Sequence, residues 1–300
     1  MRPFRAHRCL LRENGFQQAQ WCALSNGLAR DESVSHITVM WQASRRSPGA
    51  NGYTANLIDK ADMAAEELVA EIIARFGSAF AVVTSFQMEG MVLVDMAARI
   101  SGAVRVLTID TGRLPRATLD MIEIVERRYG IAIERIRPDP AEVSAMTSTF
   151  GTDLFRDGIA QRMLCCQIRK VRPLELALKD VRAWAYGLRR EQAESRREIA
   201  AVEEVSGKLR LHPLAGWTRA QVEEYTVRNN VPRHPLYAAG YATIGCDPCT
   251  RAIHPGEDQR AGRWWWEDDA QKECGIHFSA NGKAERTVDV LLDQVLAAAK

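Results

Sequence analysis

Two pairs of cysteines are the clearest sign of chemistry in this 300-residue chain. Cys165 and Cys166 are adjacent, and Cys246 and Cys249 form a Cys-x-x-Cys motif further along. Four thiolates from two separated segments can close around a soft metal. Paired zinc ligands are usually spaced by about two to four residues, so an adjacent pair suits a larger group better. The pattern favours an iron–sulfur cluster, with zinc and a redox disulfide as alternatives.

A further cysteine, Cys274, lies near the carboxyl end in the segment Lys272-Glu-Cys-Gly-Ile-His277. Nearby cations lower the pKa of a thiol, and the thiolate is the form that attacks an electrophile. Cys274 stands between a lysine and a histidine and is therefore a candidate nucleophile. On this local context alone, a surface thiol without a function is the competing interpretation.

Arginines form a second group of candidates, because their guanidinium forks suit phosphate and sulfate oxygens. The set is Arg189, Arg190, Arg196, Arg197, Arg251, Arg260 and Arg263. A single arginine is more often a solvated surface residue than an anion ligand. The expected position of these arginines on loops makes them stronger candidates. The run Trp264–Trp266 could stack on bases but is more often a packing cluster. Neither a Walker motif nor a dinucleotide fingerprint occurs.

The elements that must position these residues alternate between strands and helices. Strands are expected at 79–83, 104–109, 131–136, 181–186 and 209–214, and helices at 62–76, 91–100, 116–129 and 218–229. This alternation predicts an α/β fold with a doubly wound, mostly parallel sheet. Ligands of such folds bind at the carboxyl ends of the strands. The loops to watch are therefore 84–90, 110–115 and 187–197.

The chain is expected to divide into three parts. Residues 1–55 read as a poorly structured extension ending in a Gly-, Pro- and Ser-containing linker, 56–255 as the nucleotide- and cluster-binding domain, and 256–300 as a C-terminal segment carrying the catalytic cysteine. Capping signals include Asp62 before the first helix and Thr218 with Gln221 before the last of those helices.

Composition narrows the setting. The chain is 46% hydrophobic and 26% charged, with a formal net charge of +2, as in an ordinary globular protein rather than a nucleic-acid binder. No apolar run approaches the roughly 20 residues of a membrane helix, and the start lacks a secretory apolar region. We therefore expect a cytoplasmic protein without membrane or nucleic-acid partners, and a homo-oligomer remains possible.

Taken together, the motifs resemble those of the assimilatory adenylyl-sulfate reductases, in the family that also holds the phosphoadenylyl-sulfate reductases. The matching segments run in family order over roughly residues 60–280: 84–95, 109–114, 165–174, 187–192, 234–253, 256–267 and 272–277. The combination of Cys-Cys, Cys-x-x-Cys and a late Glu-Cys-Gly-Ile-His is highly specific. The loop after the first strand departs from the usual SFGAED pattern at Gln87 and Met88.

The resemblance implies a fold like that of the adenine-nucleotide α-hydrolases, the PP-loop group, and one [4Fe–4S] cluster per subunit. It implies that Cys165, Cys166, Cys246 and Cys249 are the cluster ligands and that Cys274 is catalytic, on a mobile C-terminal segment. The implied substrate-binding residues are Ser85 and Phe86 in the modified PP-loop, Asp110, Thr111 and Gly112 in the second loop, Lys170 between cluster and substrate, Arg189 or Arg190 with Arg260 and Arg263 around the phosphate and sulfate, and His277.

The reaction implied is the reduction of adenylyl sulfate to sulfite and AMP, through an S-sulfocysteine on Cys274 that thioredoxin or glutaredoxin resolves. A phosphoadenylyl-sulfate or dual-specificity reductase is the nearest alternative. A tRNA-thiolating PP-loop ATPase would need an SGGxDS-type loop, which is absent. An iron–sulfur redox sensor on a degenerate PP-loop fold is a third reading, supported by Gln87 and Met88 alone.

Overall fold

A six-stranded sheet lies at the centre of the computed structural model, which describes residues 63–267 and 282–299. Its strand order is β3-β2-β1-β4-β6-β5. The strands are β1 Phe80–Val83, β2 Arg105–Ile109, β3 Ile133–Ile136, β4 Ala183–Tyr186, β5 Val202–Val205 and β6 Lys208–Leu211. All neighbours pair in parallel except β5 and β6. The prediction of a mostly parallel sheet is confirmed.

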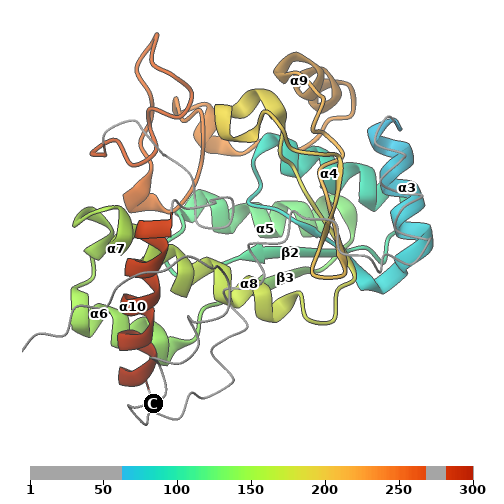
Figure 1. Cartoon of the computed structure of the whole chain (residues 1–300). Helices are drawn as coiled ribbons and strands as arrows, with labels where there is room; N and C mark the ends of the chain where they lie inside the picture. The colour runs from blue at the N-terminus through green and yellow to red at the C-terminus, as the bar shows by residue number, and fades with distance from the viewer. Residues whose placement is uncertain (1–62, 268–281, 300) are drawn as a thin grey trace, which may run out of the picture. The chain divides into compact units, whose positions relative to one another are not determined.

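Helices cover both faces of this sheet (Figure 1). The helices are α3 Ala65–Phe76, α4 Met88–Ile100, α5 Arg116–Tyr129, α6 Pro140–Phe150, α7 Ile159–Cys166, α8 Arg172–Ala177, α9 Arg219–Arg228 and α10 Gly282–Ala298. Alternate strand residues point to opposite faces. Phe80 and Val82 of β1 pack with α3, α4, α5 and α9, whereas Ala81 and Val83 pack with Leu174 of α8. The fold is therefore doubly wound, as predicted.

A separate hydrophobic cluster lies beside the sheet, where α10 packs against α6 and α7 (Figure 1). Met146, Leu164 and Leu292 contribute to it, and so does the buried Trp264. Cys165, Cys246 and Cys249 belong to the same cluster. Three of the four paired cysteines are thus held in a packed apolar region built from distant parts of the sequence.

Several element boundaries follow from local signals. The capping box opening α9 is present: the Thr218 hydroxyl accepts from the Gln221 amide, and the Gln221 side chain accepts from the Thr218 amide. Helix α5 spans the predicted residues and ends at Gly130, whose φ of 67° is left-handed. The Asp62 prediction was wrong in its position, because α3 starts at Ala65 with Ala64 as its N-cap.

Other elements were not predicted. Strand β5 pairs with β6 through a turn in which Ser206 and Gly207 both have positive φ, the pattern of a two-residue hairpin. Two glutamates in its four residues, Glu203 and Glu204, weaken the usual strand signal. Helices α6, α7 and α8 had no predicted counterpart, and α4 begins three residues earlier than expected.

The segment from α7 to α8 is one helical run interrupted by a π-helical stretch, η3, at Gln167–Val171. Cys165 and Cys166 close α7, and Lys170 lies within η3. Wide helical turns of this kind are frequent at functional sites. Within the described ranges, no helix combines the length and apolarity needed to cross a membrane.

Candidate active site

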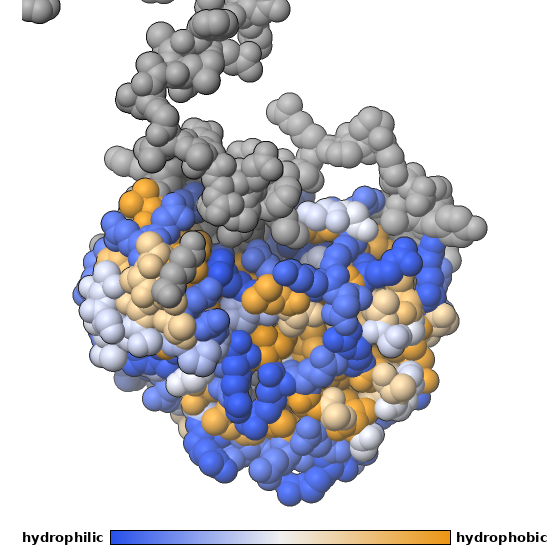
Figure 2. Space-filling model, turned by 90° about the horizontal axis from the view of Figure 1, so that it is seen from below, coloured by the Kyte–Doolittle hydropathy of each residue, from blue (hydrophilic) through white to orange (hydrophobic). Residues whose placement is uncertain are grey.

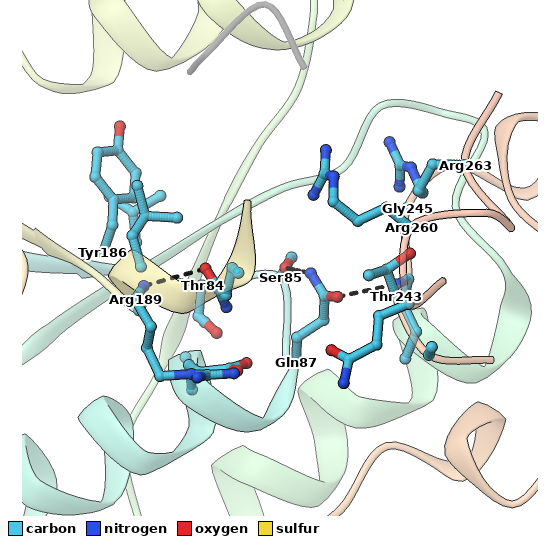
Figure 3. A pocket seen from close by; sticks show the side chains of 18 of the residues that line it. Thr84, Ser85, Gln87, Tyr186, Arg189, Thr243, Gly245, Arg260 and Arg263 are labelled. Atoms are coloured by element: carbon cyan, nitrogen blue, oxygen red, sulfur yellow. Dashed lines mark hydrogen bonds and ion pairs between the residues drawn. The ribbon is translucent and has the colours of Figure 1, made fainter. Parts of the chain in front are cut away.

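A cleft of about 220 Å³ opens at the carboxyl ends of the parallel strands. Its walls include Ile109 and Thr111 at the end of β2 and Gly187 after β4. Thr84 and Ser85 after β1, and Tyr186 and Arg189 at the end of β4, line it as well (Figure 3). Strands β1 and β4 are neighbours. The strands that follow β1 in the chain, β2 and β3, lie on one side of this pair, and those that follow β4, β5 and β6, lie on the other. Ligands of doubly wound folds bind at such a switch point, so the cleft lies where the fold predicts a ligand.

The start of helix α4 forms part of this cleft. Gln87, Glu89 and Gly90 line it, and the loop after β4 packs directly against them. A Cβ atom on Gly187 would lie 2.6 Å from the backbone of Glu89 and Gly90, so only glycine allows this approach. The first amide of α4, that of Met88, donates to the Tyr237 hydroxyl at 3.1 Å, and the positive end of the helix dipole faces the cleft.

Phe86 shapes the loop after β1 without entering the cleft. Its side chain is fully buried in the main core, and its φ of 59° is left-handed. Its amide donates to the Thr84 hydroxyl at 2.9 Å. Of the two PP-loop residues predicted to bind substrate, the structure therefore brings Ser85 to the cleft and places Phe86 behind it.

The loop after β2 shows a similar division. Thr111 lines the cleft, whereas Asp110 and Gly112 are not among its lining residues. The Asp110 carboxylate instead accepts from the Gly112 amide at 3.2 Å and from Arg137 at 3.1 Å. These contacts hold the turn that presents Thr111.

Cationic side chains dominate the polar lining of the cleft. They are Lys170, Arg189, Arg196, Arg219, Arg260 and Arg263, against the single carboxylate Glu89 in the described part of the chain. Arg189 is 1% exposed and pairs with Glu89 at 3.0 Å and with Glu191. The positive charge of Arg189 is therefore largely balanced by carboxylates on the protein.

The remaining arginine candidates, Arg190, Arg197 and Arg251, do not line the cleft. Arg190 does not line the cleft, and its Nε donates to the Ile199 carbonyl. Arg197 pairs with Glu194 on the surface, and Arg251 pairs with Glu257 at 2.8 Å. Of the pair Arg189 and Arg190, only the first reaches the cleft.

The guanidinium of Arg263 lies against Gly245, where a larger residue would collide with it. A Cβ on Gly245 would lie 1.6 Å from Nη1 of Arg263. The Arg263 guanidinium also lies 4.4 Å from the ring centre of Trp264 and donates to the Thr250 hydroxyl. Backbone, ring and hydroxyl together fix this cation beside the Cys-x-x-Cys loop.

A second, smaller cavity adjoins the cleft and is lined by all four predicted cluster ligands, Cys165, Cys166, Cys246 and Cys249. Cys246, Lys170 and Trp264 line both cavities. The cysteine cavity therefore lies directly behind the cationic end of the cleft.

The properties of this cavity fit an iron–sulfur cluster. The four thiols are buried and free of disulfides. Burial raises the pKa of Cys165, and raises that of Cys249 to about 11, so a positively charged group is needed to hold them as thiolates. The indole nitrogen of Trp264, which lines the cavity, is buried without a partner among the described residues.

Hydrogen bonding at the cysteines agrees with this fit. The Thr111 hydroxyl lies 3.2 Å from the Cys246 sulfur, a contact that would support a ligating thiolate. In residues 63–267 and 282–299, no three His, Cys, Asp or Glu side chains form a group that could hold a single metal ion.

Cys274 and His277 lie outside the described residues, as do residues 1–55 with Cys9 and Cys22. Their predicted roles, and the predicted three-part division of the chain, stay predictions. The structure adds cleft residues that the sequence reasoning did not single out: Gln192, Arg219, Tyr237 and Thr243. Three of these, Gln192, Tyr237 and Thr243, fall inside segments 187–192 and 234–253, which had been recognised as motifs but not as contacts.

Comparison with known proteins points to the same family as the motifs in the sequence. Residues 79–252 match the family described as the phosphoadenosine phosphosulfate reductase domain. The chain is 43% identical over 235 residues to an adenosine 5'-phosphosulfate reductase of Allochromatium vinosum, covering 78% of this chain and 90% of that protein. It is 37% identical over 248 residues to one of Agrobacterium fabrum, covering 81% and 94%.

A solved structure of similar fold is the phosphoadenylyl-sulfate reductase of Candida auris in complex with phosphate. Its TM-score is 0.56 and its sequence identity 25%, and the match covers 66% of this chain and 96% of that one.

Proposed function

The chain belongs to the adenylyl-sulfate and phosphoadenylyl-sulfate reductase family, and on that premise we propose that it reduces adenylyl sulfate to sulfite and AMP in sulfate assimilation. Relatives that are 37% to 44% identical to it over the aligned residues are named adenosine 5'-phosphosulfate reductases. The observation that carries the proposal is the contact between the two cavities, where a cationic cleft meets four buried cysteines that form no disulfide.

The charges of the cleft suit this substrate. Adenylyl sulfate carries a sulfate on the phosphate of AMP, so its sulfur is electrophilic but ringed by anionic oxygens. Lys170, Arg260 and Arg263 line the cleft at its cysteine end. Cations placed there offset the repulsion that an attacking thiolate meets, and they stabilise the charge that leaves with AMP. We assign the phosphate end to the first turn of α4 and to Arg189, which acts there as a hydrogen-bond donor because Glu89 and Glu191 largely balance its charge.

We propose that Cys165, Cys166, Cys246 and Cys249 hold one [4Fe–4S] cluster per subunit. When bound, the cluster would change the electrostatic potential at the end of the cleft that holds the sulfate. Lys170 lines both cavities and is the side chain through which this influence would reach the substrate. Thr111 and Trp264 would donate hydrogen bonds toward the cysteine cavity.

The chemical steps are assigned to Cys274. Its thiolate attacks the sulfur of adenylyl sulfate, a sulfur–sulfur bond forms, and the bond to the AMP phosphate oxygen breaks. AMP leaves with the electron pair, and the enzyme holds an S-sulfocysteine. His277, three residues away, is proposed to contact the substrate in the same step.

Release of sulfite then needs a second thiol, because the four cysteines of the small cavity serve as ligands. We propose an external dithiol, thioredoxin or glutaredoxin. One donor thiol attacks the Cys274 sulfur and expels sulfite, and the second donor thiol restores Cys274 and leaves an oxidised donor. The donor thus supplies both electrons. Such donors keep thiols reduced in the cytoplasm, where we place the reaction.

A phosphoadenylyl-sulfate reductase, or one that accepts both nucleotides, is the second candidate. It is favoured by the similarity in fold to the Candida auris phosphoadenylyl-sulfate reductase. The identities of 37% to 44% to proteins named for adenosine 5'-phosphosulfate favour the first candidate. Comparing the rates on the two nucleotides separates them.

A single-turnover experiment tests the assignment of Cys274. Protein mixed with adenylyl sulfate in the absence of a dithiol should gain the mass of one sulfite group and release one AMP. Cys274→Ser should do neither, while Cys22→Ser should behave as wild type. If Cys274→Ser still accumulates a protein-bound sulfite, the nucleophile is another residue.

A further inference from the structure

Two neutral side chains in the cleft wall, Gln87 and Thr243, have no part in the reaction as proposed. Gln87 directly precedes α4, and Thr243 lies in the loop that leads to Cys246. Both line the cleft. Figure 3 shows the Gln87 side chain crossing from the start of α4 to the loop that carries Thr243. Gln87 is also where the loop departs from the family pattern.

The orientation of the Gln87 carboxamide is fixed by its partners. The backbone amide of Ile244 donates to Oε1 of Gln87 at 2.9 Å. An amide can only donate, so the oxygen must face Ile244 and the nitrogen must face Ser85, whose hydroxyl accepts at 3.1 Å. The nitrogen carries two hydrogens, and the bond to Ser85 uses one. The other is left for water or for a ligand in the cleft, which Gln87 lines.

Gln87 does not cap α4 with its side chain. It holds the N-cap position but makes no side-chain cap bond, because its carboxamide is engaged with Ser85 and Ile244. Side chains at this position commonly accept a bond from an amide of the first turn. The Met88 amide at the start of α4 donates instead to the Tyr237 hydroxyl at 3.1 Å, so an anion here is favoured by the helix dipole and not by a free first amide.

Thr243 provides an independent indication of a ligand. Its hydroxyl oxygen is buried, yet it has no hydrogen-bond partner among the described residues. A buried hydroxyl without a partner is destabilising, and such groups are rare unless a ligand or water completes them. Because Thr243 lines the cleft, a group bound there is the natural partner for this hydroxyl.

We propose that Gln87 and Thr243 bind a phosphate oxygen of the adenosine nucleotide and so position it between the loop after β1 and the loop that carries Cys246. This inference rests on the proposed function, since it takes the ligand to be an adenylyl nucleotide. Lys170, Arg260 and Arg263 provide charge for the neighbouring sulfate, whereas these two neutral groups fix the direction of the phosphate. Gln87 supplies by side chain a donor that a glycine loop would supply by backbone.

Binding of AMP to the purified, iron-loaded protein tests the role of Thr243. Thr243→Val removes the hydroxyl while keeping the shape of the side chain, and we expect it to weaken AMP about three- to tenfold, the loss of one neutral hydrogen bond. Thr243→Ser should bind AMP as wild type does. Thr149→Val is the matched control, because that hydroxyl bonds the Ala145 carbonyl within α6. AMP affinity of Thr243→Val equal to that of the control would overturn the inference.

Two substitutions of Gln87 distinguish a residue that contacts the ligand from one that only joins the two loops. Gln87→Glu keeps an acceptor for the Ile244 amide but places a carboxylate beside the phosphate. Gln87→Met loses the bond to Ile244 but adds no charge. Contact with the phosphate predicts that Gln87→Glu binds AMP more weakly than Gln87→Met does. The reverse order would mean that Gln87 only joins the loops, and the proposal for this residue would be wrong.

The same samples distinguish this inference from the proposed function. Wild-type protein that binds AMP but releases no sulfite from adenylyl sulfate would refute the reaction and leave the AMP affinities to decide the inference. Wild-type protein that binds no AMP would overturn the inference directly. With active protein, we expect Thr243→Val to raise KM for adenylyl sulfate by the same factor as the AMP dissociation constant, with kcat within about twofold.

Discussion

The hydroxyl of Thr111 lies 3.2 Å from the sulfur of Cys246, so the loop after β2 touches the Cys-x-x-Cys loop directly. A second bond reinforces this contact, because the Asp247 amide donates to the Arg113 carbonyl at 2.8 Å. The loop after β1 reaches the same segment through Gln87 and Ile244. Both loops of the nucleotide cleft are therefore hydrogen-bonded to the segment that carries two predicted cluster ligands.

Thr111→Val should weaken the hold on the cluster without preventing its assembly. The change removes one hydrogen bond to a ligating sulfur, worth about 1 kcal/mol, and we expect several-fold faster loss of the visible cluster absorbance in air. Thr111→Ser, which keeps the hydroxyl, should match the wild type. Equal bleaching of all three proteins would show that the contact has no effect on the cluster.

Removal of a ligand tests the cysteine cavity. Cys246→Ala should leave the protein with little iron and lower sulfite release at least about tenfold, because four-thiolate clusters need all their ligands. Iron and zinc are measured on the same preparation by elemental analysis, with Cys22→Ser as the control. Stoichiometric zinc and no iron in the wild-type protein would replace the cluster with a zinc site.

Gly245→Ala should displace Arg263. The added Cβ would fall 1.6 Å from the guanidinium, so either the loop or the arginine must move. We expect kcat/KM for adenylyl sulfate to fall about tenfold or more, about 1.4 kcal/mol, as one stabilising cation leaves its place. Gly102→Ala is the matched control, because nothing lies within 4 Å of its Cβ position. Equal kcat/KM in the two variants would remove Arg263 from the site.

His234 should make stability depend on pH. It is buried, its Nδ1 accepts from the Leu236 amide, and its Nε2 lies 3.0 Å from the Thr118 hydroxyl. Burial lowers the pKa of His234 to about 4. As the pH falls, the unfolded state binds this proton at about pH 6.5, before the folded state does. The unfolding free energy is therefore at its full value above about pH 6.5 and falls as the pH drops toward 4. The loss is on the order of 3 kcal/mol.

The check on this prediction is urea unfolding between pH 7 and pH 4. His234→Asn keeps an acceptor for the Leu236 amide but cannot titrate, so its unfolding free energy should fall less steeply over this range. Parallel curves for the two proteins would assign the acid sensitivity to other groups.

Much of the fold was predictable because its signals are local. The capping box at Thr218 and Gln221, and the glycine that ends α5 at Gly130, confine their helices to within a residue or so of the prediction. Apolar runs predicted β1, β2 and β4 for the same reason. Strand β5 was missed because an edge strand with one exposed face, rich in glutamate, lacks such a run.

The candidate site was predictable only in part. Motifs named Ser85, Thr111 and Lys170, and each lines the cleft. Spacing could not reveal that Arg189 is paired with Glu89, since the two are distant in sequence and meet through packing of α4 against the loop after β4. Nor could it reveal Thr243, whose significance is a buried hydroxyl without a partner.

The proposed reaction is the reduction of adenylyl sulfate by an iron-loaded protein. The most direct test is sulfite release from adenylyl sulfate and from phosphoadenylyl sulfate, with thioredoxin as donor, on protein purified without oxygen and assayed for iron in the same sample. We predict iron-loaded protein that turns over adenylyl sulfate at least about tenfold faster than the phosphorylated nucleotide. Iron-loaded protein that is idle on both nucleotides would contradict the account and favour a redox sensor whose loop at Gln87 and Met88 has lost the family's chemistry.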